Sequence, residues 1–248
     1  MRGLSAKELL ELWERGMENS EIERGLLMLS YCQPEYPWDR LAAVTIGRRD
    51  AMLLQLRQAT LGPVLNAFAV CPGCASELEF AMNTEELAPA SANVCVAEAK
   101  CDAHEFKQGL FSVRCRLPDS TDLYAAGSCG SVEEARQTIL SRCITSIEGA
   151  DSALVMGEIP ASVAEGFEAY LSEQEPAAEI SLKLQCPSCA QQWNLALDIV
   201  SFFWREIQAV ARRIALEVDA LARSYGWGET EILSMTSGRR QLYLELVG

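Results

Sequence analysis

The chain has 248 residues, enough to bury a sizeable core in one large domain or two small ones. Hydrophobic residues make up 49% of it, which excludes an intrinsically disordered chain. With 35 acidic and 21 basic residues the formal net charge is −14, so a surface that tracks nucleic-acid phosphates is not expected as the main function, although a small basic patch stays open.

The start of the chain, "MRGLSAKELLELWERG", has the pattern of an amphipathic helix. It lacks the apolar core and the small-residue cleavage site of a secretory signal. No apolar run in the chain reaches the roughly 18 residues that a membrane helix requires. These observations predict a cytoplasmic protein without a membrane partner.

Residues 1–70 are predicted to form a helical segment. Capping boxes mark the starts of the first two predicted helices. The first box is Ser5 with Glu8, and the second is Ser20 with Glu23. After the turn "QPEYPW", the pattern predicts a short helix around Leu41 and a longer one over 48–60. The run "NAFAV" then leads as a strand into a pair of cysteines.

Residues 84–177 are predicted to form a small central α/β insertion. The alternating runs "ANVCVAEA" (92–99) and "LFSVRCRLP" (110–118) indicate a hairpin, and helices are expected at "STDLYAAG" and "SVEEARQTILSRCI", the latter with a capping box of Ser131 and Glu134. The stretch "IEGADSALVMGEIP" (147–160) is the best linker candidate. A helix over 161–173 and an alternating strand, "AEISLKLQ", complete this part of the chain.

Residues 199–248 are predicted to form a C-terminal helical segment. Its first helix, expected over 198–225, carries an apolar stripe that is more typical of a core face than of a cofactor site; the stripe is Ile199, Phe203, Ile207, Val210, Ile214, Val218 and Leu221. Large apolar side chains continue to the end of the chain, so the tail either docks on the protein's own helices or forms a partner surface. A competing partner surface lies around Tyr36 and Trp38.

Two parts of the chain share a second pattern, Tyr-x-Trp followed by Thr-x-Gly-Arg-Arg. They are "YPWDRLAAVTIGRRDAMLLQL" near the start and "YGWGETEILSMTSGRRQLYLEL" at the end. A simple tandem duplication does not explain them, because the pattern precedes the cysteine pair in the front half and follows it in the back half. Convergent helix starts remain an equal alternative.

The strongest chemical signal is a pair of matched stretches, "CPGCASELEFAMN" from Cys71 and "CPSCAQQWNLALD" from Cys186. Two residues between paired cysteines let one tight turn present both sulfurs to a single ion. Strands on both sides of each turn are typical of a zinc ribbon, in which two hairpins meet at one metal. The sequence therefore predicts one structural zinc ion held by Cys71, Cys74, Cys186 and Cys189.

The 111 residues between Cys74 and Cys186 (186 − 74 − 1) make this spacing much longer than in an ordinary ribbon, but the matched tails restore its specificity. Their like-placed apolar residues are expected on the inner faces of two hairpins that pack side by side, and these residues are Leu78, Phe80, Met82, Trp193, Leu195 and Leu197. The predicted fold class is α+β, in which the N- and C-terminal helical segments surround a split zinc-ribbon-like pair of hairpins at 71–83 and 178–198.

Other interpretations of the cysteines are weaker. A redox Cys-x-x-Cys site would open a helix in a strand-helix-strand unit, and a catalytic zinc would need a ligand position for water, which four thiolates close. Cys95, Cys101 and His104 form the only other cluster, with a spacing that fits no common ligand pattern. No phosphate-binding glycine loop or nucleophile elbow is present, so no enzyme activity is expected.

At "SFFWREIQAVARRIALEVDALARSYGWGETEILSMTSGRRQLYLELV" the sequence resembles a family of phage-like proteins that are encoded with contractile injection systems and are related to the baseplate-hub assembly chaperones of T-even phages. The similarity extends along the chain through "LLELWERG", the Gly-Arg-Arg run at 47–49, both Cys-Pro-x-Cys hairpins, "RCRLPDSTDLYAA", Tyr225-Gly226-Trp227, and Arg239 with Arg240. The resemblance implies a non-enzymatic factor that helps to build the spike and hub end of a contractile tail, with baseplate hub or spike proteins as partners.

Two functional hypotheses follow. One is a zinc-stapled assembly chaperone or minor component of a contractile injection baseplate, and the other is a zinc-ribbon nucleic-acid-binding regulator. A DNA-binding ribbon usually carries Lys and Arg on its strands, whereas the first hairpin carries Glu77 and Glu79. The baseplate hypothesis is therefore favoured, and no nucleic-acid partner is expected.

Overall fold

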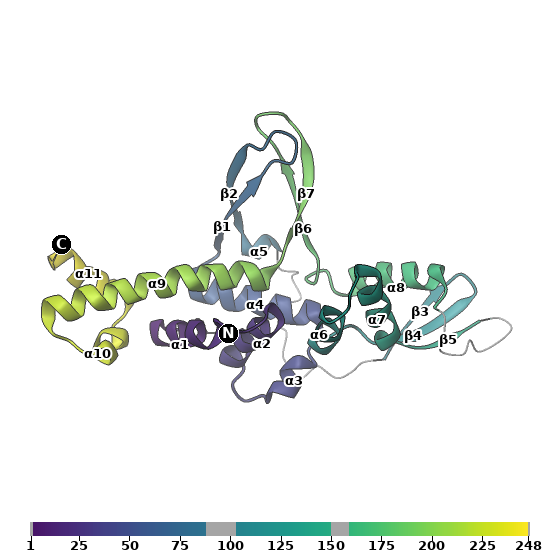
Figure 1. The fold of residues 1–248 in the computed structure, drawn as a ribbon, viewed down its shortest axis with the longest axis horizontal. Helices are drawn as coiled ribbons and strands as arrows, with labels where there is room; N and C mark the ends of the chain where they lie inside the picture. Colours follow the sequence, from purple (N-terminus) through teal and green to yellow (C-terminus); the bar gives the residue numbers. More distant parts are fainter. Residues whose placement is uncertain (1, 88–102, 150–158, 248) are drawn as a thin grey trace.

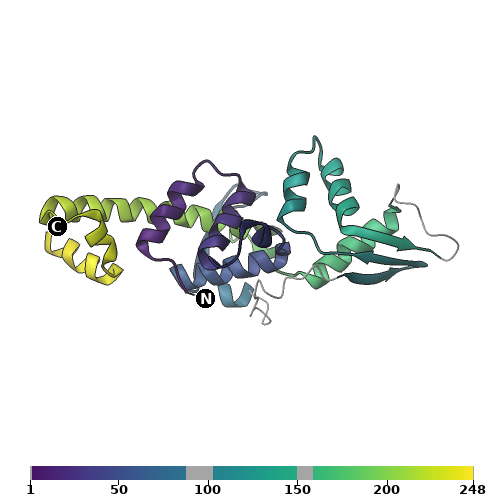
Figure 2. The same ribbon diagram turned by 90° about the horizontal axis from the view of Figure 1, so that it is seen from below.

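The computed structural model describes residues 2–87, 103–149 and 159–247. The molecule is elongated, with a bundle of helices in the middle and two hairpins that project from it (Figure 1). An α/β unit lies at one end of the long axis and the C-terminal helices lie at the other, which the second view shows equally (Figure 2). Helices and small antiparallel sheets together confirm the predicted α+β class.

The helical bundle is built from both ends of the sequence. Its helices are α1 (Ala6–Gly16), α2 (Glu21–Cys32), α3 (Trp38–Ala42), α4 (Ile46–Leu61) and α9 (Ile199–Tyr225). The predicted capping boxes at Ser5 and Ser20 are confirmed, since each hydroxyl accepts the backbone N–H of the glutamate three residues later. No helix among the described residues is long and apolar enough to cross a membrane.

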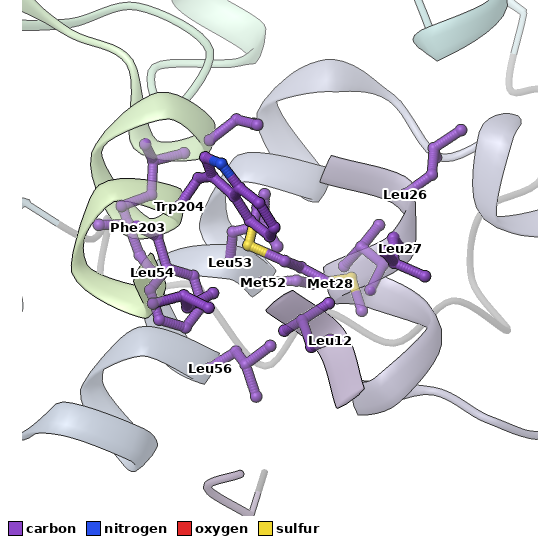
Figure 3. Close-up of a cluster of buried hydrophobic side chains, with 14 of the residues drawn as sticks. Leu12, Leu26, Leu27, Met28, Met52, Leu53, Leu54, Leu56, Phe203 and Trp204 are labelled. Atoms are coloured by element: carbon purple, nitrogen blue, oxygen red, sulfur yellow. The ribbon is translucent and has the colours of Figure 1, made fainter. Parts of the chain in front are cut away.

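The main core lies where α9 crosses the N-terminal helices. Figure 3 shows Met28 of α2 and Met52 of α4 converging with Phe203 of α9, and all three side chains are fully buried. Trp204 packs against Gly16, where a Cβ atom would come within 2.4 Å of the indole ring. The predicted apolar stripe of α9 is therefore a core face.

The α/β unit consists of a three-stranded antiparallel sheet and three helices. The sheet has the order β3 (His104–Gln108), β4 (Phe111–Cys115), β5 (Ile144–Glu148), and the helices are α6 (Ser120–Gly127), α7 (Val132–Cys143) and α8 (Ala161–Gln174). Its own core includes Val113, Leu140, Cys143, Ile144 and Phe167. A separate apolar cluster indicates that this unit folds around its own centre rather than extending the core of the bundle.

The predicted partner of the strand at 110–118 was wrong. β4 (Phe111–Cys115) pairs with β3 (His104–Gln108) on one side and β5 (Ile144–Glu148) on the other, so both of its edges are occupied. The proposed partner, 92–99, lies outside the described residues. Gly109, at φ +60°, makes the tight turn between β3 and β4 possible. The predicted linker begins within β5, and most of its remainder also lies outside the described residues.

A buried carboxylate joins α6 to the rest of this unit. The Asp122 side chain is completely buried, and it accepts hydrogen bonds from Arg116 at 2.6 and 2.7 Å and from Arg142 at 2.6 Å. Burial raises the pKa of this carboxyl, but the hydrogen bonds from Arg116, the Asp119 N–H and Arg142 outweigh burial and lower the pKa to about 2.

We expect the protein to lose stability in acid through Asp122. The folded pKa of Asp122, about 2, lies below its reference value of 3.8 in an unfolded chain. The carboxylate therefore contributes fully to folding stability above about pH 4, and this contribution is lost as the pH falls toward 2. The shift corresponds to about 2 kcal/mol. Chemical denaturation should show that wild type has a larger free energy of unfolding than Asp122→Asn at pH 7. This difference between the two proteins should be smaller at pH 3. A difference that does not change with pH would contradict this role.

Glu175, at the C-terminal end of α8, joins the α/β unit to the bundle. Its buried carboxylate accepts hydrogen bonds from the Thr45 hydroxyl and, at 3.1 Å, from the Gly47 N–H, and so caps the N-terminus of α4. A Cβ on Gly47 would approach the Cβ of Glu175 to 2.6 Å. This contact explains the glycine of the first Gly-Arg-Arg run.

The second Gly-Arg-Arg run also lies at a helix start, in α11 (Ser237–Val247), but Gly238 has no neighbour that would exclude a side chain. What the two runs share is a buried second arginine. Arg49 pairs with Asp50 at 2.7 Å, and Arg240 pairs with Glu217 at 2.9 Å. The different surroundings support convergent helix starts as the origin of the repeated pattern.

Candidate metal centre

Two antiparallel hairpins carry the four paired cysteines at their tips. The first consists of β1 (Val64–Val70) and β2 (Glu77–Asn83), and the second of β6 (Ile180–Gln185) and β7 (Gln192–Leu197). Both project from the helical bundle in the same direction, and their tips lie together (Figure 1).

The two tips have the same turn. In the first, the Cys71 N–H donates to the Ser76 carbonyl and the Ala75 N–H donates to the Cys71 carbonyl, both at 2.9 Å. Cys186 makes the equivalent bonds with Gln191 and Ala190, also at 2.9 Å. Ala75 and Ala190 have positive φ values of 57° and 59°, which non-glycine residues rarely adopt. The matched Cys-Pro-x-Cys-Ala formula therefore produces two copies of one strained turn.

These turns bring all four predicted ligands together, because the sulfur atoms of Cys71, Cys74, Cys186 and Cys189 lie within 4.8 Å of one another. The Cys71–Cys189 and Cys74–Cys186 sulfur pairs are each 3.6 Å apart. A disulfide would place its sulfurs at about 2.05 Å, whereas four sulfurs at about 2.3 Å from a tetrahedral zinc are about 3.8 Å apart. The arrangement can hold a metal ion and resembles an open thiolate tetrahedron.

The surroundings of the sulfurs favour the thiolate form at two positions. A hydrogen bond to the Ser76 hydroxyl, 3.2 Å away, contributes most to lowering the pKa of Cys74 to about 6. Burial raises the pKa of Cys186, but backbone hydrogen bonds from Cys189 and Ser188 outweigh it, so the pKa is lowered. Thiolates are the form of cysteine that binds metals.

Cys189 differs from the other ligands. A backbone hydrogen bond with Gln191 lowers its pKa, but hydrogen bonding within the sulfur cluster, chiefly with Cys74, outweighs this and raises the pKa to about 12. Four thiolates without a metal would repel one another, which disfavours ionisation of the last sulfur. A cation at the centre of the cluster would remove that repulsion.

The six predicted inner-face residues lie on one face of each hairpin, as the pairings Phe80 with Ala67 and Leu195 with Leu182 show. All six are half-buried rather than fully buried. A cleft of about 580 Å³ separates the bases of the hairpins above α9, and its lining includes Ala67, Leu182, Leu195 and Phe202. The hairpins thus meet at the cysteines and diverge toward the bundle.

Arg57 of α4 holds the first hairpin on the bundle. Its buried guanidinium pairs with Glu206 of α9 at 2.6 and 2.9 Å and donates to the carbonyls of Gly62 and Val64 at 2.6 and 2.8 Å. One side chain therefore fixes two helices and the start of β1. Sequence analysis did not identify Arg57, because a single arginine within an amphipathic helix gives no signal of burial.

The remaining candidate residues do not join this centre. His104 lies in β3, where its Nδ1 is 3.0 Å from the Tyr170 hydroxyl, while Cys95 and Cys101 lie outside the described residues. Cys115 and Cys143 are buried, and burial raises their pKa values to about 11 and 12. Within 2–87, 103–149 and 159–247, the four paired cysteines are the only group of His, Cys, Asp and Glu side chains placed to hold a metal.

The chain matches no curated protein and no solved structure. A protein-family model described as "T4 bacteriophage base plate protein" matches residues 27–204, which is well over half of the chain. The matched segment begins in α2, contains both cysteine hairpins and the α/β unit, and ends in the first part of α9. The chain therefore belongs to the T4 bacteriophage base plate protein family.

Proposed function

We propose that this protein is a non-enzymatic assembly chaperone or minor baseplate/hub component of a phage-like contractile injection system. The observation that carries the proposal is the family match over residues 27–204. Its partners are baseplate hub or spike proteins, which it binds in the cytoplasm. A baseplate is built by ordered binding of subunits, so a protein in this role acts by differential binding rather than by chemistry.

We propose further that one structural zinc ion, held by Cys71, Cys74, Cys186 and Cys189, staples the two hairpins. The support is the sulfur geometry and the two identical turns. Four thiolates fill a tetrahedral shell and leave no position for a reacting water, so the ion has a structural role. The chain is then organised as residues 1–70, the hairpins at 71–83 and 178–198, the insertion 84–177, and residues 199–248.

The C-terminal tail supplies a partner surface in this proposal, although much of it docks on α9. Tyr225 stacks on Trp227 with ring centroids 4.3 Å apart, and Ile232 of α10 (Glu229–Ser234) is fully buried. Two leucines of α11 remain largely exposed, Leu242 at 56% and Leu246 at 69%. Since they lie one helical turn apart, they form a continuous apolar strip.

Deletion of the chain after Tyr225 tests this surface. We expect the shortened protein to keep its metal and most of its far-UV helix signal, because the cysteine hairpins do not involve α10 or α11 and only Leu233 of the tail packs against the main core. It should lose co-purification with the hub and spike proteins, and particles from that strain should lack a complete hub.

The double variant Leu242→Ser, Leu246→Ser removes only the exposed strip and should show the same loss without disturbing the packed part of the tail. Trp38→Ser, in which another exposed apolar residue is changed, tests the competing surface near Tyr36 separately. Normal particles from a strain with stable shortened protein would show that this surface is not the working one.

A further inference from the structure

The outer faces of the two hairpins differ, although their turns and inner faces match. The first hairpin exposes three large apolar side chains of β1, which are Val64 at 53%, Phe68 at 54% and Val70 at 51%. The equivalent face of the second hairpin carries Ser181, Lys183, Gln185, Gln192, Asn194 and Ala196. The second hairpin thus shows that this architecture does not require an apolar outer face, and the one on β1 needs another explanation.

We propose that this surface, the β1 outer face (Val64, Phe68 and Val70), docks an extended segment of another baseplate protein that carries both apolar and basic side chains. The inference rests on the proposed function and adds a second contact to that of the C-terminal tail.

The backbone of β1 is suited to an added strand. Within the described part of the chain, β1 pairs with β2 alone, so beyond Val64, whose carbonyl is bonded to Arg57, the other edge of this strand has no backbone partner. Exposed edge strands are usually protected by lysine, proline or short length. The sequence of β1, "VLNAFAV", has no Lys or Pro, so the edge is open to pairing with an extended partner.

The side chains of an added segment have places to enter on both sides of β1. A shallow hollow of about 510 Å³ lies on the outer face, where Phe68, Glu79 and Ala81 contribute to its lining. The inter-hairpin cleft of about 580 Å³ takes its first-hairpin lining from β1 alone, through Asn66, Ala67 and Phe68. Because alternate side chains of a strand point to opposite faces, one segment along β1 can fill both spaces.

Charge identifies the kind of partner. Glu77 and Glu79 lie opposite Val70 and Phe68 on the outer face, and neither carboxylate forms an ion pair with a described residue. The sequence from 64 to 83 contains no Lys or Arg, and the whole chain has a net charge of −14. A second copy would bring like charges together, whereas lysines or arginines of a different protein would pair with these carboxylates.

A photo-crosslinking amino acid at position 68 of the full-length protein, co-expressed with the baseplate proteins of its injection system, tests the inference. We expect an adduct on one baseplate protein, in a segment with alternating apolar and basic residues. Phe68→Ser should weaken binding of that protein about tenfold, as for a central interface residue, and Glu79→Lys should weaken it and reduce its salt dependence.

Leu216→Ser, in which another exposed apolar side chain far from the hairpins is changed, is the matched control and should leave binding unchanged. Melting curves must be similar for all variants. If Phe68→Ser and Glu79→Lys both bind the partner as strongly as the wild type does, this inference is overturned while the proposed function stays intact. An adduct between two copies of this chain, or on an acidic segment, would also overturn it. Absence of any association of the wild type would instead count against the proposed function.

Discussion

Removal of the proposed zinc ion is expected to lower the melting temperature markedly, because the two cysteine pairs that would hold it are separated by 111 residues in the sequence (186 − 74 − 1). By analogy with a covalent cross-link, closure of a loop of this length lowers the entropy of the unfolded chain and thereby stabilises the folded state by about 5 kcal/mol. Elemental analysis of protein purified without chelator should find one zinc ion per chain, and calorimetry should show the loss of stability after chelation.

The double variant Cys71→Ser, Cys186→Ser should contain no zinc and should melt at the temperature of the chelated wild type. Cys129→Ser provides the matched control, since the Cys129 sulfur contacts Ala125 and Thr138 in the α6–α7 region and lies outside the sulfur cluster. Full zinc occupancy in the double variant, or an unchanged melting curve after verified metal removal, would show that these four cysteines do not form a structural site.

Arg57→Met should be strongly destabilising, at about 3 kcal/mol. The variant retains the bulk of the side chain but leaves the Glu206 carboxylate without its guanidinium and the carbonyls of Gly62 and Val64 without their donor. Glu206 retains 22% of its side-chain exposure, so water offsets part of the cost. Chemical denaturation of the purified variant measures the change in free energy of unfolding.

The control for this charge removal is Arg223→Met. Arg223 also pairs with a carboxylate, Asp219 at 2.8 Å, but both side chains are largely exposed. Its loss should cost less than about 1 kcal/mol, as is usual for surface pairs. Equal effects of Arg57→Met and Arg223→Met would indicate that Arg57 does not anchor the first hairpin.

The features that were predictable from sequence depend on residues that lie close together along the chain. The capping boxes at Ser5 and Ser20 depend on residues three apart, and the helices followed from apolar periodicity. The cysteine turns could be recognised because the same five-residue formula occurs twice, and two matched turns with one shared chemistry suggest a single centre even across a long gap.

The missed features depend on contacts between distant segments. β3 is only five residues long and polar in part, and its status as a strand depends on pairing with β4. Glu175 reads as one more acidic residue at the end of a helix, yet it caps α4 from 128 residues away in the sequence. The hairpins were expected to pack side by side through their inner faces, but a cleft lined by both hairpins and α9 separates those faces near the bundle.

The arrangement of the two turns has a mechanical consequence when the ion is bound. A pull on the two chain ends would first load the packing of α9 on the N-terminal helices, and once this opened it would reach the metal–sulfur bonds through β1 and β7. The whole α/β unit would lie in a side loop between those bonds. Since an extended residue spans about 3.5 Å, about 390 Å of chain would stay hidden until a metal–sulfur bond broke. In an assembling baseplate, force transmitted between the ends of this protein would therefore bypass the α/β unit, which could keep its fold and its contacts under load.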